Sequence, residues 1–364
     1  MSAAKEASTD RLSVPARAER TPLVHVRTPT YRRPEALRRC LESIRAQVWR
    51  NWVCDVFDDD MQGSARSVVA ELDDSRIRYT RNPGQKFASR NIDQCFSRQN
   101  PHDADYFCII EDDNAMLPEY MAQGIEDCRR HKVEIVLRNQ FVELESASER
   151  ARLLDCGVLD ERYREGVMSP QTLRMALLVF HGVSNSGLFW SRRARSDLEV
   201  GYACNVTFAE HLRTFSIREP IFIGLEPKAV WADNGAGSTR NNGLKKSEIR
   251  RELDLKRNIV ELQGVVWHDA TVAQRAGFLS NSAFHFSAEA RAEGLAKAHL
   301  AANAGGTLSS RRAAELYARG ALIRLAGRLE AELPGFIRER RLLEPAPAQG
   351  YCASNAGPDC ATSA

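Results

Sequence analysis

The sequence lacks any hydrophobic run close to the roughly 20 residues that a membrane-spanning helix needs. Its first 22 residues are polar and charged, without the apolar stretch of a secretory signal. None of its nine cysteines forms a C-x-x-C pair or shows zinc-site spacing. We therefore expect reduced thiols and a cytoplasmic protein with no transmembrane segment, either free or bound peripherally at the membrane.

The sequence also lacks an excess of charge of either sign. Its 364 residues carry 51 Lys and Arg against 48 Asp and Glu, a net charge of +3. Proteins that coat nucleic acid are usually far more basic, so we expect no nucleic-acid partner. Hydrophobic residues make up 43% of the chain, enough to bury a core in one large domain or two ordinary ones.

What the sequence does have is an alternation of short apolar runs and amphipathic segments from residue 23 onward. Helical patterns separate five strand-like runs, at 23–26, 52–57, 77–82, 105–110 and 133–138. Continuous apolar strands that alternate with helices are typical of an α/β fold, with a mostly parallel sheet flanked by helices. In such a sheet the ligand site lies beyond the carboxyl ends of the strands.

The remaining segments differ from this pattern. Residues 1–22 and 344–364 are rich in small and polar residues, so we expect a flexible leader and a flexible tail. Residues 139–240 mix strand and helix signals, whereas 241–343 are helical. The helical region either packs on the α/β part or joins copies of the chain into a homo-oligomer.

Polar clusters follow the predicted strands. Residues 30–34, TYRRP, start a helix beside an aromatic ring and arginines, which suits a nucleotide. A carboxylate of the Asp triplet at 58–60 can accept hydrogen bonds from a base or a ribose. The acids at 111–113, EDD, offer the oxygen ligands that Mg²⁺ or Mn²⁺ prefers. Each cluster alone also fits an ordinary solvated turn.

In this order the motifs resemble the family-2 glycosyltransferases of the GT-A fold. The family pattern of a strand, P-T-Y-N-R-P, a helix, A-Q and Trp is matched by Pro29, Thr30, Tyr31, Arg33, Pro34, Ala46, Gln47 and Trp52. The resemblance is close over 22–130, thinner to 238, and absent from the helical C-terminal part. It implies a GT-A domain at 23–240, with a nucleotide-sugar-binding half at 23–138 and an acceptor half at 139–240.

The resemblance also implies roles for single residues. Glu111 stands where the family often has the first Asp of its D-x-D motif, and Arg27 occupies a strand position that is usually apolar. Donor binding is expected from Pro29, from Tyr31 and Asp59 at the nucleoside, from Arg90 at the base or diphosphate, and from Asp112 near the ribose. The metal, Mn²⁺ or Mg²⁺, is expected on Asp113 and Glu111.

The family implies an inverting transfer from a nucleotide-diphosphate sugar, with a UDP-sugar as the first candidate. Its general base belongs in the second half of the domain, where Glu210 in FAEHLR has the matching place and Asp197 and Glu199 compete. A Gly- and Asn-rich loop at 231–242 could cover the donor, with Asp233 and Asn234 as substitutes for a missing late histidine ligand. The acceptor stays open: a glycan, a lipid-linked molecule, a peptide or a small molecule.

Two alternatives remain at this point. A sugar-phosphate nucleotidyltransferase also combines an α/β nucleotide domain with a metal, but its first loop resembles G-x-G-T-R-x-x-P, where this chain has TPTYRRP. A non-catalytic interaction protein would use the helices at 245–342 as its working surface. The charged clusters at 30–34, 58–60 and 111–113 disfavour such a non-catalytic protein, because a protein without a working site has no reason to keep all three.

Overall fold

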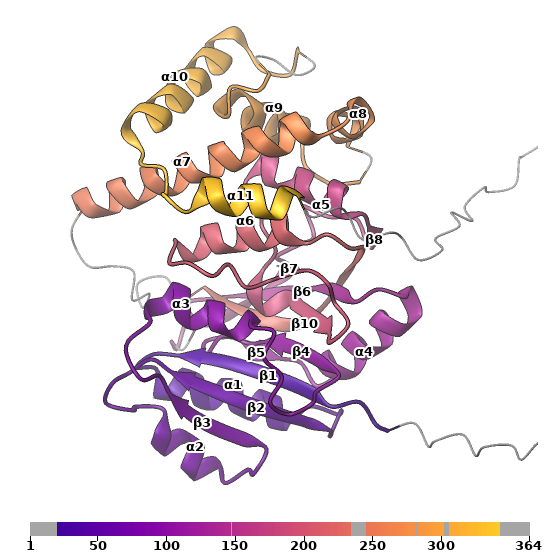
Figure 1. Cartoon of the computed structure of the whole chain (residues 1–364), viewed down its shortest axis with the longest axis vertical. Coiled ribbons are helices and arrows are strands. Elements are labelled where there is room, and N and C mark those ends of the chain that lie inside the picture. The colour runs from indigo at the N-terminus through magenta and orange to yellow at the C-terminus, as the bar shows by residue number, and fades with distance from the viewer. Residues whose placement is uncertain (1–19, 147, 234–244, 282, 302–305, 343–364) are drawn as a thin grey trace, which may run out of the picture.

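The computed structural model describes residues 20–146, 148–233, 245–281, 283–301 and 306–342. Within these residues a curled ten-stranded sheet is flanked by helices, and the C-terminal helices gather at one end of an elongated molecule (Figure 1). Most of the predicted leader and the whole predicted tail lie outside the described residues. The last two residues of the predicted leader, Thr21 and Pro22, are held in place, because their carbonyls accept hydrogen bonds from Asn51 and Trp49.

The first half of the sheet is parallel, in the order β3-β2-β1-β4. Its strands are β1 (Val24–Thr30), β2 (Trp52–Asp58), β3 (Ile77–Arg81) and β4 (Tyr106–Ile109). The helices between them are α1 (Pro34–Arg45), α2 (Arg66–Leu72) and α3 (Phe87–Asp93). Because parallel strands end on the same side, the clusters at 30–34, 58–60 and 111–113 meet along one edge of the sheet.

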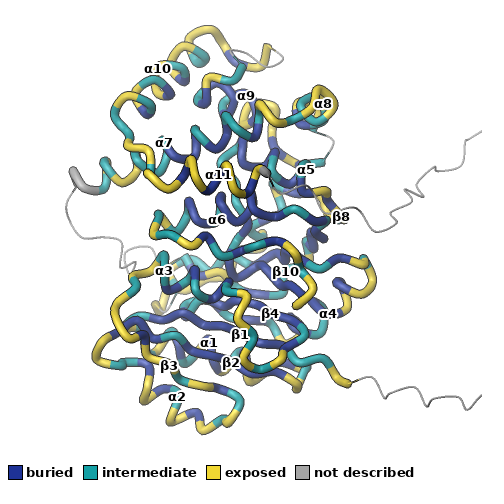
Figure 2. The backbone as a smooth tube through the Cα atoms, viewed as in Figure 1, coloured by how far each residue is buried: buried dark blue, intermediate teal, exposed yellow. Residues whose placement is uncertain are grey.

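The packing of α1 explains why this segment is a helix. Pro34 occupies the first turn, where its missing N–H costs no hydrogen bond. The buried residues then recur at helical spacing and pack against the apolar face of β1 and β2. On α1 these are Leu37, Cys40, Leu41 and Ile44. Figure 2 shows this face as part of a continuous buried layer.

Beyond β4 the sheet becomes mixed. The strand β9 (Leu188–Ser191) runs antiparallel to both β4 and β6 (Ile135–Leu144), and β10 (Ile221–Asp233) runs parallel to β6. Shorter antiparallel strands are β5 (Ala115–Met116), β7 (Arg152–Gly157) and β8 (Gly166–Met168). The helices of this part are α4 (Tyr120–His131), α5 (Pro170–Met175) and α6 (Val206–Ser216). The predicted α/β fold class is confirmed, with the parallel pairing concentrated in the first half.

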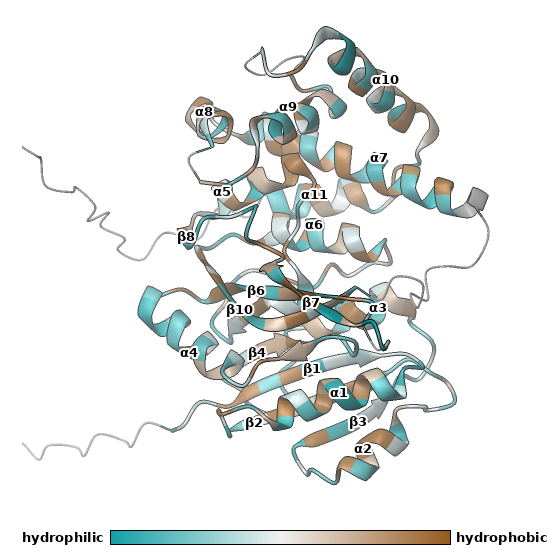
Figure 3. Cartoon of the chain, turned by 180° about the vertical axis from the view of Figure 1, so that it is seen from behind, coloured by the Kyte–Doolittle hydropathy of each residue, from teal (hydrophilic) through white to brown (hydrophobic). Residues whose placement is uncertain are grey.

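The C-terminal part is helical, as expected. It contains α7 (Lys245–Asp269), α8 (Val272–Ser280), α9 (Ala288–Lys297), α10 (Ser310–Ala326) and α11 (Leu333–Leu342). Figure 3 shows apolar and polar residues alternating along α7, as in a helix that buries one side. Gln263 of α7 donates to the carbonyl of Leu177 at 2.8 Å, and Leu262 shares a core with Leu212 of α6. The helices thus pack on α6 and on the segment 176–179, in the second half of the domain. No helix in the described ranges is both long and apolar enough to cross a bilayer.

Candidate active site

The acids after β4 lie against the residues that follow β1. The Oδ2 atom of Asp112 accepts a hydrogen bond from Thr30 Oγ1 at 2.7 Å and a longer one from the Tyr31 amide at 3.4 Å. The guanidinium of Arg33 contacts the carboxylates of both Asp112 and Asp113. β1 and β4 are parallel neighbours, so their carboxyl ends bring these two predicted clusters together.

The electrostatics of this acid cluster fit a hard divalent cation. Burial and the neighbouring charge of Asp113 raise the pKa of Asp112 to about 6. Burial, with Asp113 and Glu210 nearby, raises the pKa of Glu111 to about 8. Three acids thus stand beside one nearby arginine, Arg33. An excess of carboxylate oxygens at a strand end is the donor set that Mg²⁺ or Mn²⁺ takes.

The aspartates of the triplet after β2 accept hydrogen bonds both within their own turn and from the segment between β3 and α3. Asp58 holds its own turn, because its carboxylate accepts from the amides of Asp60 and Ala65. Asp59 is buried, and its Oδ1 atom accepts from Asn82 Nδ2 at 2.8 Å and from the Lys86 amide at 2.7 Å. Asp59 thereby joins the end of β2 to the start of the segment that carries α3.

The other residues expected to bind the sugar donor, Pro29, Tyr31 and Arg90, lie in three different parts of the site. Pro29 lies inside β1, opposite Phe57 in the register with β2. Tyr31 follows the strand directly, with the guanidinium of Arg32 5.0 Å from the centre of its ring. Arg90 of α3 donates to the carbonyl of Gly201, which ties α3 to the loop before α6.

Glu210 comes close to the acid cluster through one asparagine. Its Oε1 atom accepts a hydrogen bond from the Asn185 amide at 3.4 Å. The side chain of the same Asn185 donates to Glu111 Oε1 at 3.3 Å. The helix that carries Glu210 is fixed at its start, where Asn205 caps α6. The structure therefore brings an acid of the second half beside the acids of the first half.

Arg213, which the sequence analysis missed, holds this asparagine in place. It is fully buried, donates to Asn185 Oδ1 at 2.9 Å and forms an ion pair with Asp93 at 2.8 Å. Its guanidinium lies 3.9 Å from the centre of the Phe96 ring. Asp93 also accepts from the amides of residues 200 and 201. On a helix with mixed polarity, nothing in the sequence distinguishes this arginine from a surface charge.

The two competitors of Glu210 lie elsewhere. Asp197 is paired with Arg340 of α11 at 2.7 Å, and Arg340 also donates to the backbone carbonyl of Glu199. The Asp197 carboxylate and the Glu199 backbone therefore belong to the contact between their loop and α11. Of the predicted loop at 231–242, Asp233 ends β10, whereas Asn234 and the residues after it lie outside the described residues.

The structure accounts for Arg27, whose place in a strand had no explanation. Its guanidinium donates to the carbonyls of Cys95 at 2.9 Å and Ser97 at 2.6 Å, and also to that of Gln99. It lies 4.9 Å from the centre of the Phe107 ring. Arg27 thus anchors the segment 95–99 over the sheet, and its role is to satisfy backbone acceptors.

A second group with metal-ligand chemistry consists of His25, Asp55 and His102. Their ligand atoms lie within 4.8 Å of one another, and both histidine Nε2 atoms are 2.9 Å from Asp55 Oδ2. Arg27 donates to His25 Nδ1 at 3.4 Å, so Nε2 of His25 carries the proton that it donates to Asp55. Hydrogen bonds therefore satisfy this group, and His25 would have to lose that proton before Nε2 could hold a metal.

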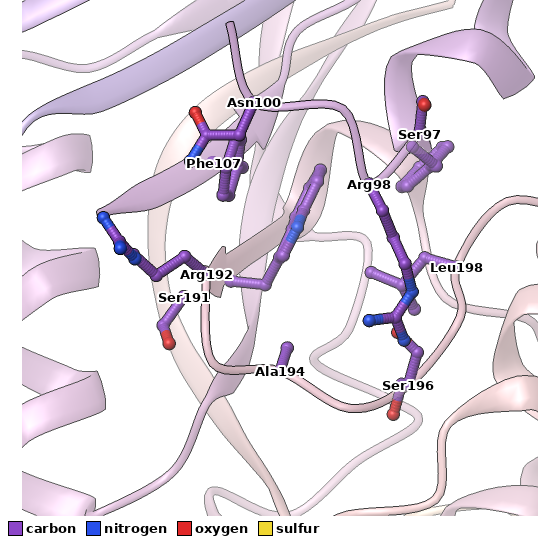
Figure 4. A pocket seen from close by; sticks show the side chains of 11 residues that line it. Ser97, Arg98, Asn100, Phe107, Ser191, Arg192, Ala194, Ser196 and Leu198 are labelled. Atoms are coloured by element: carbon purple, nitrogen blue, oxygen red, sulfur yellow. The ribbon is translucent and has the colours of Figure 1, made fainter. Parts of the chain in front are cut away.

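A small cavity of about 240 Å³ lies beside β4 and β9, and Figure 4 shows the side chains that line it. Phe107 and Trp190 are stacked in its wall, with ring centres 5.8 Å apart. Its arginines already have partners: Arg98 donates to the carbonyl of Ser196, and Arg192 pairs with Asp103. Phe107 is near the start of β4, four residues before Glu111, so this cavity lies apart from the acid cluster.

The sheet topology and the flanking helices are those of the GT-A fold. Residues 26–197 match the model of glycosyl transferase family 2. Residues 26–197 therefore form a family-2 glycosyltransferase domain, as the motifs predicted, and the rest of the chain lies outside the match. This result favours a glycosyltransferase over both alternatives that the sequence left open. No curated protein sequence matches the chain.

The solved structures that resemble this chain differ strongly from it in sequence. S. aureus TarS 1-349 in complex with UDP-GlcNAc aligns with a TM-score of 0.52 and 10% identity, over 82% of this chain and 81% of that one. The same protein with UDP gives 0.51 and 10%, over 83% and 88%. The mannosyltransferase PcManGT from Pyrobaculum calidifontis, with GDP-Man and Mn²⁺, gives 0.43 and 14%, over 89% and 85%. At such identities the likeness of TarS concerns the fold alone.

Proposed function

We propose that the chain transfers a sugar from a nucleotide-diphosphate donor, a UDP-sugar first, to an acceptor hydroxyl with inversion at the anomeric carbon. The observation that carries this proposal is the position of Asn185. Its backbone N–H donates to Glu210, and its side-chain NH2 group donates to Glu111. An inverting transfer needs a base of the acceptor half beside the acids that bind the donor. The UDP-GlcNAc and UDP complexes of the similar TarS fold support the choice of donor.

We assign donor binding to the edge of the sheet where the carboxyl ends of β1, β2 and β4 lie. We assign the nucleoside to Tyr31 and Asp59, because both lie directly beyond neighbouring strand ends. Asp112 is assigned to the ribose. The remaining donor contacts are assigned to Pro29, which leads into the turn after β1, and to Arg90, which starts from α3 at the same edge.

Asp113 and Glu111 are the proposed holders of Mn²⁺ or Mg²⁺. Asp113 is the more accessible of the two aspartates that Arg33 contacts, with a side-chain exposure of 17% against 8% for Asp112. When bound, the ion would neutralise negative charge on the leaving diphosphate. The chain's own contribution is to hold three acids on one turn and to keep Arg33 close to their charge.

Glu210 is the proposed base. Its carboxylate takes the proton of the acceptor hydroxyl while that oxygen forms a bond to the anomeric carbon. The bond between this carbon and the diphosphate oxygen breaks, and its electron pair leaves with the diphosphate. The hydrogen bond from the Asn185 amide to Glu210 Oε1 orients the carboxylate before the reaction.

We also propose the division into a donor half at 23–138, an acceptor half at 139–240 and a helical region at 241–343. A cytoplasmic location, free or peripheral at the membrane, is supported by the unpaired cysteines among the described residues, most of which are buried. The acceptor classes named above, including lipid-linked molecules, are all compatible with this location.

A donor screen with the purified chain and Mn²⁺ tests the reaction, with release of nucleoside diphosphate as the measured signal. Glu210→Gln should bind donor normally yet transfer sugar about 10²–10⁴-fold more slowly, since it keeps the size of the side chain and removes its basicity. Asp197→Asn and Glu199→Gln are the matched controls. Retained activity in Glu210→Gln, with loss in one control, would move the base to that residue. If no nucleotide sugar binds or turns over, the proposed reaction is wrong.

A further inference from the structure

A second cavity, of about 650 Å³, lies between the acceptor half and the C-terminal helices. Its volume falls within the usual range of small-molecule sites. Residues 160–162 form one side, and residues 285–287 with Ala290, at the start of α9, form the opposite side. His181 completes the lining. The cavity is therefore built jointly by the family-2 domain and the helical region that the family model does not cover.

The cavity adjoins the helix turn that carries the proposed base. Gly182 follows His181 in the chain, and a Cβ atom at this glycine would come within 2.8 Å of the Glu210 carbonyl carbon. The lining residue Arg162 also interacts electrostatically with Glu210. Burial lowers the pKa of the Arg162 guanidinium, and the negative charges of Glu161 and Glu210 partly offset that effect. The cavity therefore lies close to the backbone of the helix turn that carries Glu210.

The two sides of the cavity are fixed to each other. The amide of His285 donates to the carbonyl of Arg162 at 3.0 Å, next to a strand-like bridge between Tyr163 and Phe284. His181 stacks on Phe286 with a ring-centre distance of 5.4 Å and an angle of 11°. The helical region thus provides a positioned wall, so the cavity is formed before any ligand arrives.

The lining chemistry is that of a site for an uncharged, hydroxyl-rich ligand. Its formal charges are two carboxylates, Asp160 and Glu161, against one guanidinium, Arg162, which gives no net attraction for an anion. Carboxylate and guanidinium groups together pair with hydroxyls that both donate and accept. The His181 ring, flat and stacked on Phe286, offers a surface for the C–H face of a sugar ring.

We propose that this cavity binds the acceptor, and that the acceptor is an uncharged saccharide. The inference rests on the proposed function and deepens it, because it selects one acceptor class among those left open. It also gives the C-terminal helices a role as one wall of the acceptor site. Acceptor recognition therefore depends on residues outside the part of the chain that matches the family.

The test compares two tryptophan substitutions on α9. Ala290→Trp fills the cavity, whereas Ala288→Trp changes an exposed alanine of the same helix turn that does not line it. Methyl glycosides of glucose, galactose, mannose and N-acetylglucosamine serve as probes, with binding to the full chain measured by ligand-observed NMR. We expect a glycoside to bind the wild type and Ala288→Trp alike, and Ala290→Trp to bind it about tenfold more weakly.

A second pair of variants guards against a folding defect. Arg162→Gln should weaken glycoside binding, and Arg164→Gln, an exposed neighbour outside the lining, should not. The inference is overturned if no glycoside binds the wild type, if Ala290→Trp and Arg162→Gln bind like the wild type, or if glucose 6-phosphate binds better than methyl glucoside. UDP with Mn²⁺, titrated by calorimetry into the same samples, reports on the proposed function separately, because the donor edge is untouched by these substitutions.

Discussion

Replacing Arg213 with methionine tests whether the link between the two halves of the domain depends on one buried charge. The arginine is fully buried and contacts Asp93 and Asn185 at 2.8 and 2.9 Å. Methionine keeps most of the side-chain stem that packs near Phe96. It removes every donor, so it leaves a buried carboxylate without its counter-charge.

The expected cost is about 3–5 kcal/mol, the usual result of removing one partner from a buried ion pair. Two backbone amides, of residues 200 and 201, still donate to Asp93 at 2.8 Å, which favours the lower half of that range. Arg193→Met is the control, because its side chain is 74% exposed and its ion pair with Glu134 contributes at most about 1 kcal/mol.

Thermal and urea unfolding of the full chain measure this difference. The double variant Arg213→Met with Asp93→Asn should recover about 1 kcal/mol, because it removes the uncompensated charge, while its single amide oxygen accepts from only one of the two backbone donors, which bond to separate oxygens of Asp93. Donor turnover should fall in Arg213→Met even below its unfolding temperature, since Asn185 loses the group that orients it toward Glu111 and Glu210. The reasoning is refuted if Arg213→Met unfolds like Arg193→Met, or if the double variant is as unstable as the sum of the two single changes.

Three further predictions concern separate parts of the molecule. Asp113→Ala should abolish transfer at saturating Mn²⁺ while leaving the melting temperature unchanged or higher, because it relieves repulsion among carboxylates; near-normal turnover would refute the metal assignment. Asp59→Asn should raise the donor KM about tenfold with a smaller effect on kcat, since a nucleoside contact acts equally in ground and transition states; steady-state kinetics with the reverse pattern would contradict it. Burial lowers the pKa of His25 from 6.5 to about 4. As the pH drops through this interval, the unfolded chain takes up the proton before the folded chain does, so the free energy of unfolding falls. The loss for this residue is about 3 kcal/mol. In unfolding measured across that pH range, His25→Gln should reduce the loss and His268→Gln, an exposed histidine, should not.

Periodicity and motif spacing were sufficient for the first half of the domain. The strand ends and the helix α1 were predictable because a buried strand or an amphipathic helix is defined by residues within a few positions of one another. The acids at 111–113 could be placed at the sheet edge for the same reason. Motif order also predicted the family, which the match over residues 26–197 confirms.

The contacts that complete the candidate site were not predictable in this way. No motif assigned a role to Asn185, or to Arg213 at the end of FAEHLR, and Arg213 meets Asp93 across 120 positions of the chain. Arg27 looked misplaced in its strand until the structure showed backbone carbonyls around it, 68 to 72 positions away. In each case the partner is distant in sequence, so no local pattern records the pairing.

The sequence by itself therefore determined the α/β class, the strand-end acids and the family, since these follow from short-range periodicity and fixed spacing. Only the tertiary structure decided which second-half acid stands beside Glu111, and that the C-terminal helices form one side of a cavity near the helix turn of that acid. The physical reason is that a buried polar group must find a partner wherever the folded chain offers one. Arg340 shows the same rule, because it finds its partner Asp197 across 143 positions.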